Sequence, residues 1–95
     1  MYKGNSLVII PSYNESENII EIINDITKQK ESFNVLIVDD NSPDKTYELV
    51  EEEIIKKPKR VFLIRRKKKL GLGTAYIEGF KWAIDNGYER IFEMD

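Results

Sequence analysis

The sequence predicts an α/β domain built on a parallel sheet, with strands and helices alternating as βαβαβαβ. Short apolar runs recur along the chain, and segments with helical periodicity separate them. A run without alternating polar residues is typical of a strand that is buried on both faces, as in parallel sheets. Parallel strands need crossover connections, which the intervening helices supply. Ninety-five residues suffice for one small domain but not for two.

The first strand and helix are predicted from residues 7 to 26. Leu7 to Ile10 form an apolar run, and Pro11 ends it because proline has no N–H to donate to a sheet. Asn14 is predicted to cap the next helix, with Glu17 completing a capping box. Four isoleucines then fall at helical spacing on one face: Ile19, Ile22, Ile23 and Ile26.

The second strand is predicted from Phe33 to Val38, and a second helix follows it. Ser42 followed by Pro43 is typical of an N-cap with proline at the first helical position. One face of this helix carries Tyr47, Val50 and Ile54. Two favourable charge pairs are expected at i,i+4 spacing, Glu52 with Lys56 and Glu53 with Lys57.

The third and fourth strands are predicted from Val61 to Ile64 and from Ile91 onward. Between them the periodicity predicts a helix over about 74–86, with Gly87 as its C-terminal cap. The side chains that this helix is expected to bury are Tyr76, Phe80, Ala83 and Ile84.

Composition narrows the possible chemistry. The chain has no cysteine and no histidine, so disulfides, thiolate metal sites and histidine bases are excluded. Catalysis would rest on carboxylates, hydroxyls, lysine, arginine or a bound cation. No apolar stretch approaches the ~20 residues that span a bilayer, and no signal peptide is evident. A net charge of −2 identifies no partner, and we expect a soluble cytoplasmic domain.

Two aspartates, Asp39 and Asp40, directly follow the second strand. In parallel sheets ligands bind beyond the carboxyl ends of the strands, where these carboxylates are predicted to lie. They could accept hydrogen bonds from a nucleobase or from ribose hydroxyls, or help to hold a cation. The simpler interpretation is a pair of turn or helix caps, and Asp44, near a helix N-terminus, is expected to be one.

Two further segments are predicted to reach the same edge. In residues 11–15, Tyr13 and Glu15 would suit stacking on a base and accepting its N–H groups, although a simple turn also explains this segment. In residues 65–76, Gly71 and Gly73 would let a basic loop approach a diphosphate, although a solvated charged loop is the usual alternative. The dinucleotide fingerprint and the Walker loop both fail. Nucleic-acid binding is not favoured, because no aromatic residues interleave the basic run.

Four segments in this order resemble family 2 glycosyltransferases of the GT-A fold, and among them the dolichyl- or polyprenyl-phosphate mannose synthases. They are IIPSYNESENI (9–19), VLIVDDNSPDKT (35–46), KLGLGTAYIEGFKWA (69–83) and FEMD (92–95). The resemblance implies that residues 1–95 are the N-terminal, nucleotide-binding half of a Rossmann-like GT-A domain. It also implies mannose transfer from GDP-mannose to a polyprenyl (dolichyl) phosphate, at the cytoplasmic face of a membrane and with Mg²⁺ or Mn²⁺.

The resemblance also implies roles for individual residues. The residues implied to bind the nucleotide sugar are Pro11, Tyr13, Glu15, Asp39, Asp40, Gly71 and Gly73. Which of the two adjacent aspartates contacts the base stays open. Asp95 matches the first aspartate of the family's Asp-x-Asp metal signature, and a cation there would neutralise the diphosphate leaving group.

The chain stops inside that metal signature, so the acceptor half of the family domain has no counterpart in it. We therefore expect a truncated domain that binds the nucleotide without transferring sugar. Ile91, Phe92 and Met94 would form an exposed apolar edge strand, which favours self-association. A UDP-glucose-dependent transferase and a non-catalytic nucleotide-binding module are the alternatives. A phosphotransfer receiver domain is disfavoured, because its acidic pair would follow the first strand.

Overall fold

The computed structural model describes residues 6–29, 33–67 and 70–94. Seven elements follow one another along the chain: β1 (Ser6–Ser12), α1 (Ile19–Gln29), β2 (Phe33–Asp39), α2 (Thr46–Lys56), β3 (Val61–Arg65), α3 (Leu72–Asp85) and β4 (Arg90–Glu93). This is the predicted order. The four strands form one sheet in the order β3-β2-β1-β4, and each neighbouring pair is parallel. The predicted parallel α/β fold is therefore confirmed.

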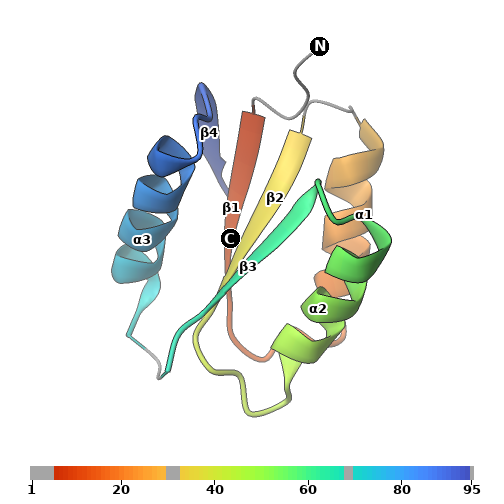
Figure 1. Ribbon diagram of the computed structural model, residues 1–95. Coiled ribbons are helices and arrows are strands. Elements are labelled where there is room, and N and C mark those ends of the chain that lie inside the picture. Colours follow the sequence, from red (N-terminus) through yellow and green to blue (C-terminus); the bar gives the residue numbers. More distant parts are fainter. Residues whose placement is uncertain (1–5, 30–32, 68–69, 95) are drawn as a thin grey trace.

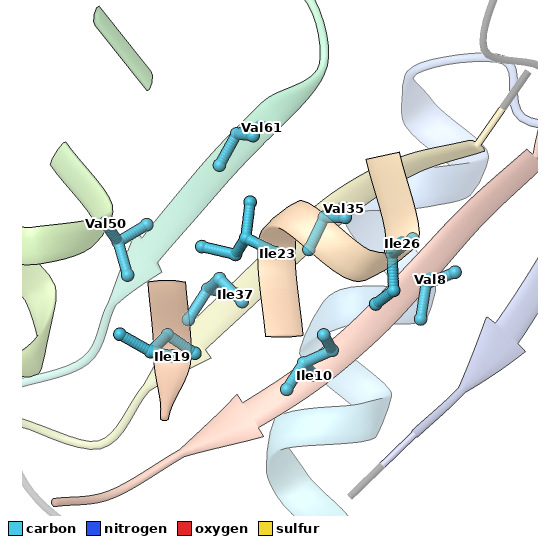
Figure 2. Close-up of a cluster of buried hydrophobic side chains, with 9 residues drawn as sticks. All are labelled: Val8, Ile10, Ile19, Ile23, Ile26, Val35, Ile37, Val50 and Val61. Carbon is cyan, nitrogen blue, oxygen red and sulfur yellow. The ribbon is translucent and has the colours of Figure 1, made fainter. Parts of the chain in front are cut away.

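The helices cover both faces of the sheet, with α1 and α2 on one face and α3 on the other (Figure 1). Val8 and Ile10 pack toward α1 and α2, whereas Leu7 and Ile9 pack toward α3. All four residues of this run are therefore buried. Figure 2 shows the α1 side of the core, where the α1 isoleucines lie over the central strands. Covering both faces explains why the middle of each of β1, β2 and β3 is an unbroken apolar run.

Helix α3 approaches the sheet through small residues. Its buried positions are Ala75, Gly79 and Ala83, which recur every four residues. A Cβ on Gly79 would lie 2.7 Å from Cγ2 of Ile9, so only glycine allows this approach. The predicted burial of Ile84 is wrong: its side chain is 68% exposed, because it follows Ala83 by about 100° around the helix. Tyr76 and Phe80 pack beside the small-residue row and are only partly buried.

The helix ends differ in how well local sequence predicted them. At the end of α3, Gly87 has φ +79 and donates its N–H to the Ile84 carbonyl, while Tyr88 donates to that of Ala83. These bonds form a Schellman cap, so the predicted C-terminal cap is confirmed.

None of the helices in the described ranges is long and apolar enough to cross a bilayer.

Both predicted N-caps are wrong. Helix α1 begins at Ile19, and the side-chain oxygen of Asn14 accepts the Asp44 N–H instead of capping it. Helix α2 begins at Thr46, and the Ser42 hydroxyl donates to Asp39. The caps failed because these polar side chains bond to residues distant in sequence or to the preceding strand. Asp44 does accept the Thr46 N–H, as expected of a carboxylate at a helix N-terminus.

Candidate functional site

The carboxyl ends of the strands carry a cleft. The pairing register places Ser12 opposite Asp39 and Asp39 opposite Arg65, so β1, β2 and β3 end in one row. The loops after these strands lie at the same end of the sheet (Figure 1). They enclose a cleft of about 220 Å³, lined by Pro11, Ser12, Tyr13, Glu15, Asp40, Gly71 and Leu72.

Most of the residues predicted to bind a nucleotide meet in this cleft. Five of the predicted seven line it: Pro11, Tyr13, Glu15, Asp40 and Gly71. Asp39 and Gly73 do not, since Asp39 is fully buried and Gly73 lies on the exposed first turn of α3. Ser12 and Leu72 also line it, although the sequence did not predict them as site residues. Only their positions in the sequence, directly after the predicted site residues Pro11 and Gly71, could have indicated that they line the cleft.

The Asp39 carboxylate is hydrogen-bonded inside the protein. Its side chain is fully buried, and Oδ1 accepts the hydroxyls of Ser12 (2.7 Å) and Ser42 (2.6 Å). Oδ2 accepts the backbone N–H of Ser42 at 3.0 Å. These three bonds join the end of β1 to the loop between β2 and α2, and they direct both carboxylate oxygens into the protein.

The loop after β1 is interlocked with the loop after β2. Three consecutive N–H groups of the first loop, those of Asn14, Glu15 and Ser16, donate to side-chain oxygens of Ser42, Thr46 and Asp44. In return, the Asp44 N–H donates to the Asn14 side chain. Asn14 has φ 57, a left-handed conformation that asparagine tolerates better than most residues. This interlock fixes the backbone that carries Tyr13 and Glu15 along one wall of the cleft.

Asp40 is the carboxylate of the pair that lines the cleft. Its Oδ1 accepts the Nε–H of Arg66, and its Oδ2 accepts the N–H groups of Leu70 (3.3 Å) and Gly71 (3.2 Å). Burial acts to raise the pKa of Asp40, but the hydrogen bonds from Arg66 and from the loop outweigh it and hold the pKa below its ordinary value. The side chain is therefore ionised at neutral pH and can only accept hydrogen bonds.

The cleft combines acceptors with an aromatic surface. A carboxylate offers about four lone-pair positions, and donors from the described part of the chain occupy three of them on Asp40, so one position on Oδ1 receives no donor from that part. Glu15 contributes a second carboxylate to the lining, and the Tyr13 side chain is 37% exposed. Such a site can stack a planar ring and accept its N–H groups or sugar hydroxyls.

A basic surface adjoins the cleft. Arg65, at the end of β3, is exposed, and its guanidinium lies 3.5 Å from the centre of the Tyr47 ring. A second depression of about 320 Å³ is lined by Arg65, Arg66, Lys67, Leu70 and Glu78. The predicted electropositive loop thus lies beside the cleft, although Lys68 and Lys69 fall outside the described residues.

The predicted metal ligand cannot be placed in the same way. Asp95 falls outside the described residues. Across residues 6–29, 33–67 and 70–94, no three side chains of the types that ligate metals converge on one point. Strand β4 runs parallel to β1 with Glu93 opposite Ile9, and the Met94 N–H continues this pairing by donating to the Ile9 carbonyl at 3.0 Å.

The family model and two relatives that match this chain point to glycosyltransferases. The sequence model of the family described as Glycosyl transferase family 2 matches residues 7–89. A polyprenol monophosphomannose synthase from Mycolicibacterium smegmatis is 43% identical over 90 residues, which cover 95% of this chain and 34% of that protein. An undecaprenyl-phosphate mannosyltransferase from Micrococcus luteus is 39% identical, with coverage of 94% and 36%.

Two further proteins extend the comparison. A dolichol-phosphate mannosyltransferase from Pyrococcus furiosus is 46% identical over 78 residues, 80% of this chain and 22% of that protein. The chain thus spans roughly a third or less of the relatives it matches. A mannosyltransferase from Pyrobaculum calidifontis, solved in complex with GDP-Man and Mn²⁺, superposes with a TM-score of 0.69 at 24% identity. The superposed region covers 86% of this chain and 25% of the solved chain, and the likeness supports the GT-A-type fold.

Proposed function

Because the chain belongs to glycosyl transferase family 2, we propose that it is the donor-nucleotide-binding part of a mannosyltransferase. The reaction would transfer mannose from GDP-mannose to a polyprenyl (dolichyl) phosphate. The names of the relatives support this donor sugar and this acceptor class. The observation that carries the proposal is the ionised Asp40 carboxylate, held in a cleft whose other walls contribute Tyr13, Glu15 and Gly71.

Each cleft residue has a distinct task in this proposal. Asp40 accepts one hydrogen bond from the base or the ribose through its remaining lone pair, and Glu15 accepts another. Tyr13 stacks on the base, with Pro11 beside it. The backbone at Gly71 can approach the donor, because no atom of a neighbouring residue lies within 4 Å of where its Cβ would stand. Gly73 is equally open but lies on the exposed first turn of α3, outside the cleft lining. Asp39 maintains the fold of the site without touching the ligand.

The diphosphate of the donor requires counter-charge. We assign Asp95 to a Mg²⁺ or Mn²⁺ ion, and the solved mannosyltransferase in complex with Mn²⁺ supports use of a divalent cation. Such a cation, when bound, supplies Lewis-acid neutralisation of the leaving nucleoside diphosphate. Residues 1–95 thus contribute nucleotide binding, and we expect this chain by itself not to transfer mannose. Transfer of radiolabelled mannose to a polyprenyl phosphate by the purified 95-residue chain would contradict that expectation.

The acceptor lipid places the reaction at a membrane. We propose a peripheral position at the cytoplasmic face, supported by the exposed Arg65 and Lys67 beside the cleft, which anionic headgroups would attract. Flotation with anionic vesicles, compared with neutral ones, measures this directly. Equal flotation in both would remove the electrostatic argument.

A UDP-sugar, such as UDP-glucose, is the second candidate donor. The donors in residues 6–29, 33–67 and 70–94 leave Asp40 a single lone pair, and one lone pair matches the single ring N–H of uracil as well as one of the two adjacent donors of guanine. In the guanine case a second acceptor, such as Glu15, must take the other donor. Direct competition between the two nucleotides therefore decides the donor class.

The first experiment is a thermal melt of the chain alone and with excess GDP or UDP, each with Mn²⁺. A ligand at about 100 times its dissociation constant adds roughly 2.7 kcal/mol, which raises the Tm of a domain of this size by several degrees. A larger shift with GDP supports the mannosyltransferase, whereas a larger shift with UDP supports the alternative. A cooperative melt that neither nucleotide shifts contradicts nucleotide binding by this chain.

A matched pair of variants links any shift to the cleft. Glu15→Gln removes a carboxylate from the lining, whereas Glu17→Gln changes an exposed residue two positions further along the same loop. We expect the first variant to reduce the GDP-induced shift and the second to retain it. Equal shifts in the two variants would exclude Glu15 from the site.

A further inference from the structure

We propose that Arg66 is the positioning residue of the cleft, because its guanidinium ties the Asp40 carboxylate to the loop that carries Gly71. It would thereby determine nucleotide affinity without contacting the nucleotide. The identity of the ligand rests on the proposed function, whereas the positioning role rests on the contacts of the unliganded chain.

Arg66 is almost completely enclosed, with a side-chain exposure of 3%. Nε donates to Oδ1 of Asp40, Nη2 donates to the Gly71 carbonyl at 2.8 Å, and Nη1 donates to the Thr74 hydroxyl at 2.9 Å. Nη1 also lies 3.5 Å from the Glu78 carboxylate. Each guanidinium nitrogen thus has its own partner, and the partners come from the end of β2, the glycine loop and α3. A lysine ammonium cannot reproduce this planar arrangement of donors.

These contacts form a closed hydrogen-bond network along one wall of the cleft. Arg66 donates to Asp40 and to the Gly71 carbonyl, and Asp40 in turn accepts the Gly71 N–H. Both polar backbone groups of Gly71 are therefore held, one by each member of the ion pair. Gly71 has φ +102, a backbone conformation that residues other than glycine rarely adopt. This wall of the cleft therefore needs both the glycine and the hydrogen bonds that Arg66 and Asp40 make to it.

The same hydrogen-bond network determines which carboxylate lone pair Asp40 can offer to a ligand. Arg66 occupies one position on Oδ1, and the loop N–H groups occupy Oδ2. Without the guanidinium, a nearly buried carboxylate loses its counter-charge, and it becomes free to rotate or to take up a proton. Either change removes the fixed acceptor that the cleft offers to a base or ribose.

Arg60 provides a matched control at the opposite end of the sheet. Its Nε donates to the Phe33 carbonyl and to the Asn34 side chain, and its Nη2 donates to the carbonyls of Phe33 and Thr27. Like Arg66, it uses a guanidinium to join segments that are distant in sequence. Because it lies at the N-terminal ends of β2 and β3, its loss should lower stability without altering the cleft.

The test compares Arg66→Lys with Arg60→Lys in the full 95-residue chain. Titration calorimetry with GDP and Mn²⁺ measures the dissociation constant, and a thermal melt measures stability. We expect both variants to lower the Tm, but only Arg66→Lys to weaken GDP binding, by tenfold or more. Millimolar guanidinium should partly restore GDP binding to Arg66→Ala. Equal dissociation constants for the two lysine variants would overturn the proposal.

Amide hydrogen exchange provides a second readout that needs no ligand. In the unliganded chain, Arg66→Lys should increase exchange at Leu70 and Gly71, whereas Arg60→Lys should leave it unchanged. If the parent chain fails to bind GDP or UDP, the proposed function fails, and this exchange measurement still decides the positioning role. Unchanged exchange at both residues in Arg66→Lys would overturn that role.

Discussion

At the scale of single residues, Asp39 and Asp40 are adjacent but bond to different parts of the molecule. Asp39 is the last residue of β2, and its carboxylate accepts hydroxyl and N–H groups from the interlocked loops. Asp40 follows the strand, and its carboxylate accepts from Arg66 and the glycine loop. Successive side chains point to opposite sides of a strand, which explains how neighbours reach separate partners.

Removing the Asp39 carboxylate should destabilise the domain. Asp39→Ala leaves the Ser12 hydroxyl, the Ser42 hydroxyl and the Ser42 N–H without this buried acceptor. We expect the free energy of unfolding to fall by about 3 kcal/mol, measured by urea denaturation. Asp25→Ala, at an exposed position of α1, is the control and should change it by less than ~0.5 kcal/mol. Equal stability of the two variants would contradict the structural role.

At the scale of secondary-structure elements, a buried carboxylate joins α2 to α1. The Glu53 side chain is 2% exposed, and its oxygens contact Lys57 at 3.2 Å and Lys56 at 3.3 Å. Lys57 also donates to the Asn24 side chain of α1 at 2.7 Å. The predicted Glu53–Lys57 pair is confirmed, whereas Lys56 contacts Glu53 in place of the predicted Glu52.

This cluster should make stability depend on acid pH. Burial acts to raise the pKa of Glu53, but the hydrogen bonds from Lys57 and Lys56 outweigh it and lower the pKa below the ordinary value of 4.5. A lowered folded-state pKa stabilises the fold fully above that ordinary value, and the contribution is lost as pH falls through the folded-state pKa. Glu53→Gln should therefore be less stable than the parent at pH 7, by about 1–2 kcal/mol.

The difference between Glu53→Gln and the parent should shrink as the pH falls from 4.5 through the lowered folded-state pKa of Glu53, because the carboxyl group becomes uncharged like the glutamine amide. Urea denaturation at pH 7, 5 and 3 measures this difference. Glu52→Gln, at the exposed neighbouring position, should track the parent at all three values. A difference that stays constant from pH 7 to pH 3 would show that Glu53 does not titrate in this way.

At the scale of the whole molecule, one edge of the sheet exposes apolar side chains. In the described part of the chain, β4 is an edge strand, and Phe92 and Met94 are 47% and 43% exposed. They border a depression of about 270 Å³ that continues into the core, lined by Val8, Ile26, Gln29, Phe33, Phe92, Glu93 and Met94. Open strand edges of this kind are prone to pair with another chain.

We therefore expect the 95-residue chain to self-associate as its concentration rises, and Phe92→Lys to reduce this association. A charge on an edge strand opposes pairing and costs little where the side chain is already half exposed. Ile55→Lys is the control, since Ile55 is 80% exposed on α2, away from β4. Static light scattering over a concentration series gives the apparent mass. A parent chain that stays monomeric throughout would refute the expectation.

Local patterns in the sequence determined the elements and their order. The runs around Val8, Val35 and Val61 predicted strands, the isoleucine spacing predicted α1, and Gly87 predicted the C-terminal cap of α3, because each signal lies within a few neighbouring residues. The rule that ligands bind at the carboxyl ends of parallel strands then brought Tyr13, Asp40 and Gly71 to one edge, where the cleft lies.

Only the tertiary structure decided how the polar side chains are paired. Asn14 bonds across 30 residues to Asp44, and Asp40 bonds across 26 residues to Arg66. The residues next to these side chains in the sequence do not indicate such distant partners. For this reason Asn14 and Ser42 were wrongly predicted to be caps, and the sequence did not distinguish the roles of Asp39 and Asp40. Hydrogen-bonding groups that are buried must find partners wherever folding brings them together. At this site, the packing of three loops provides those partners.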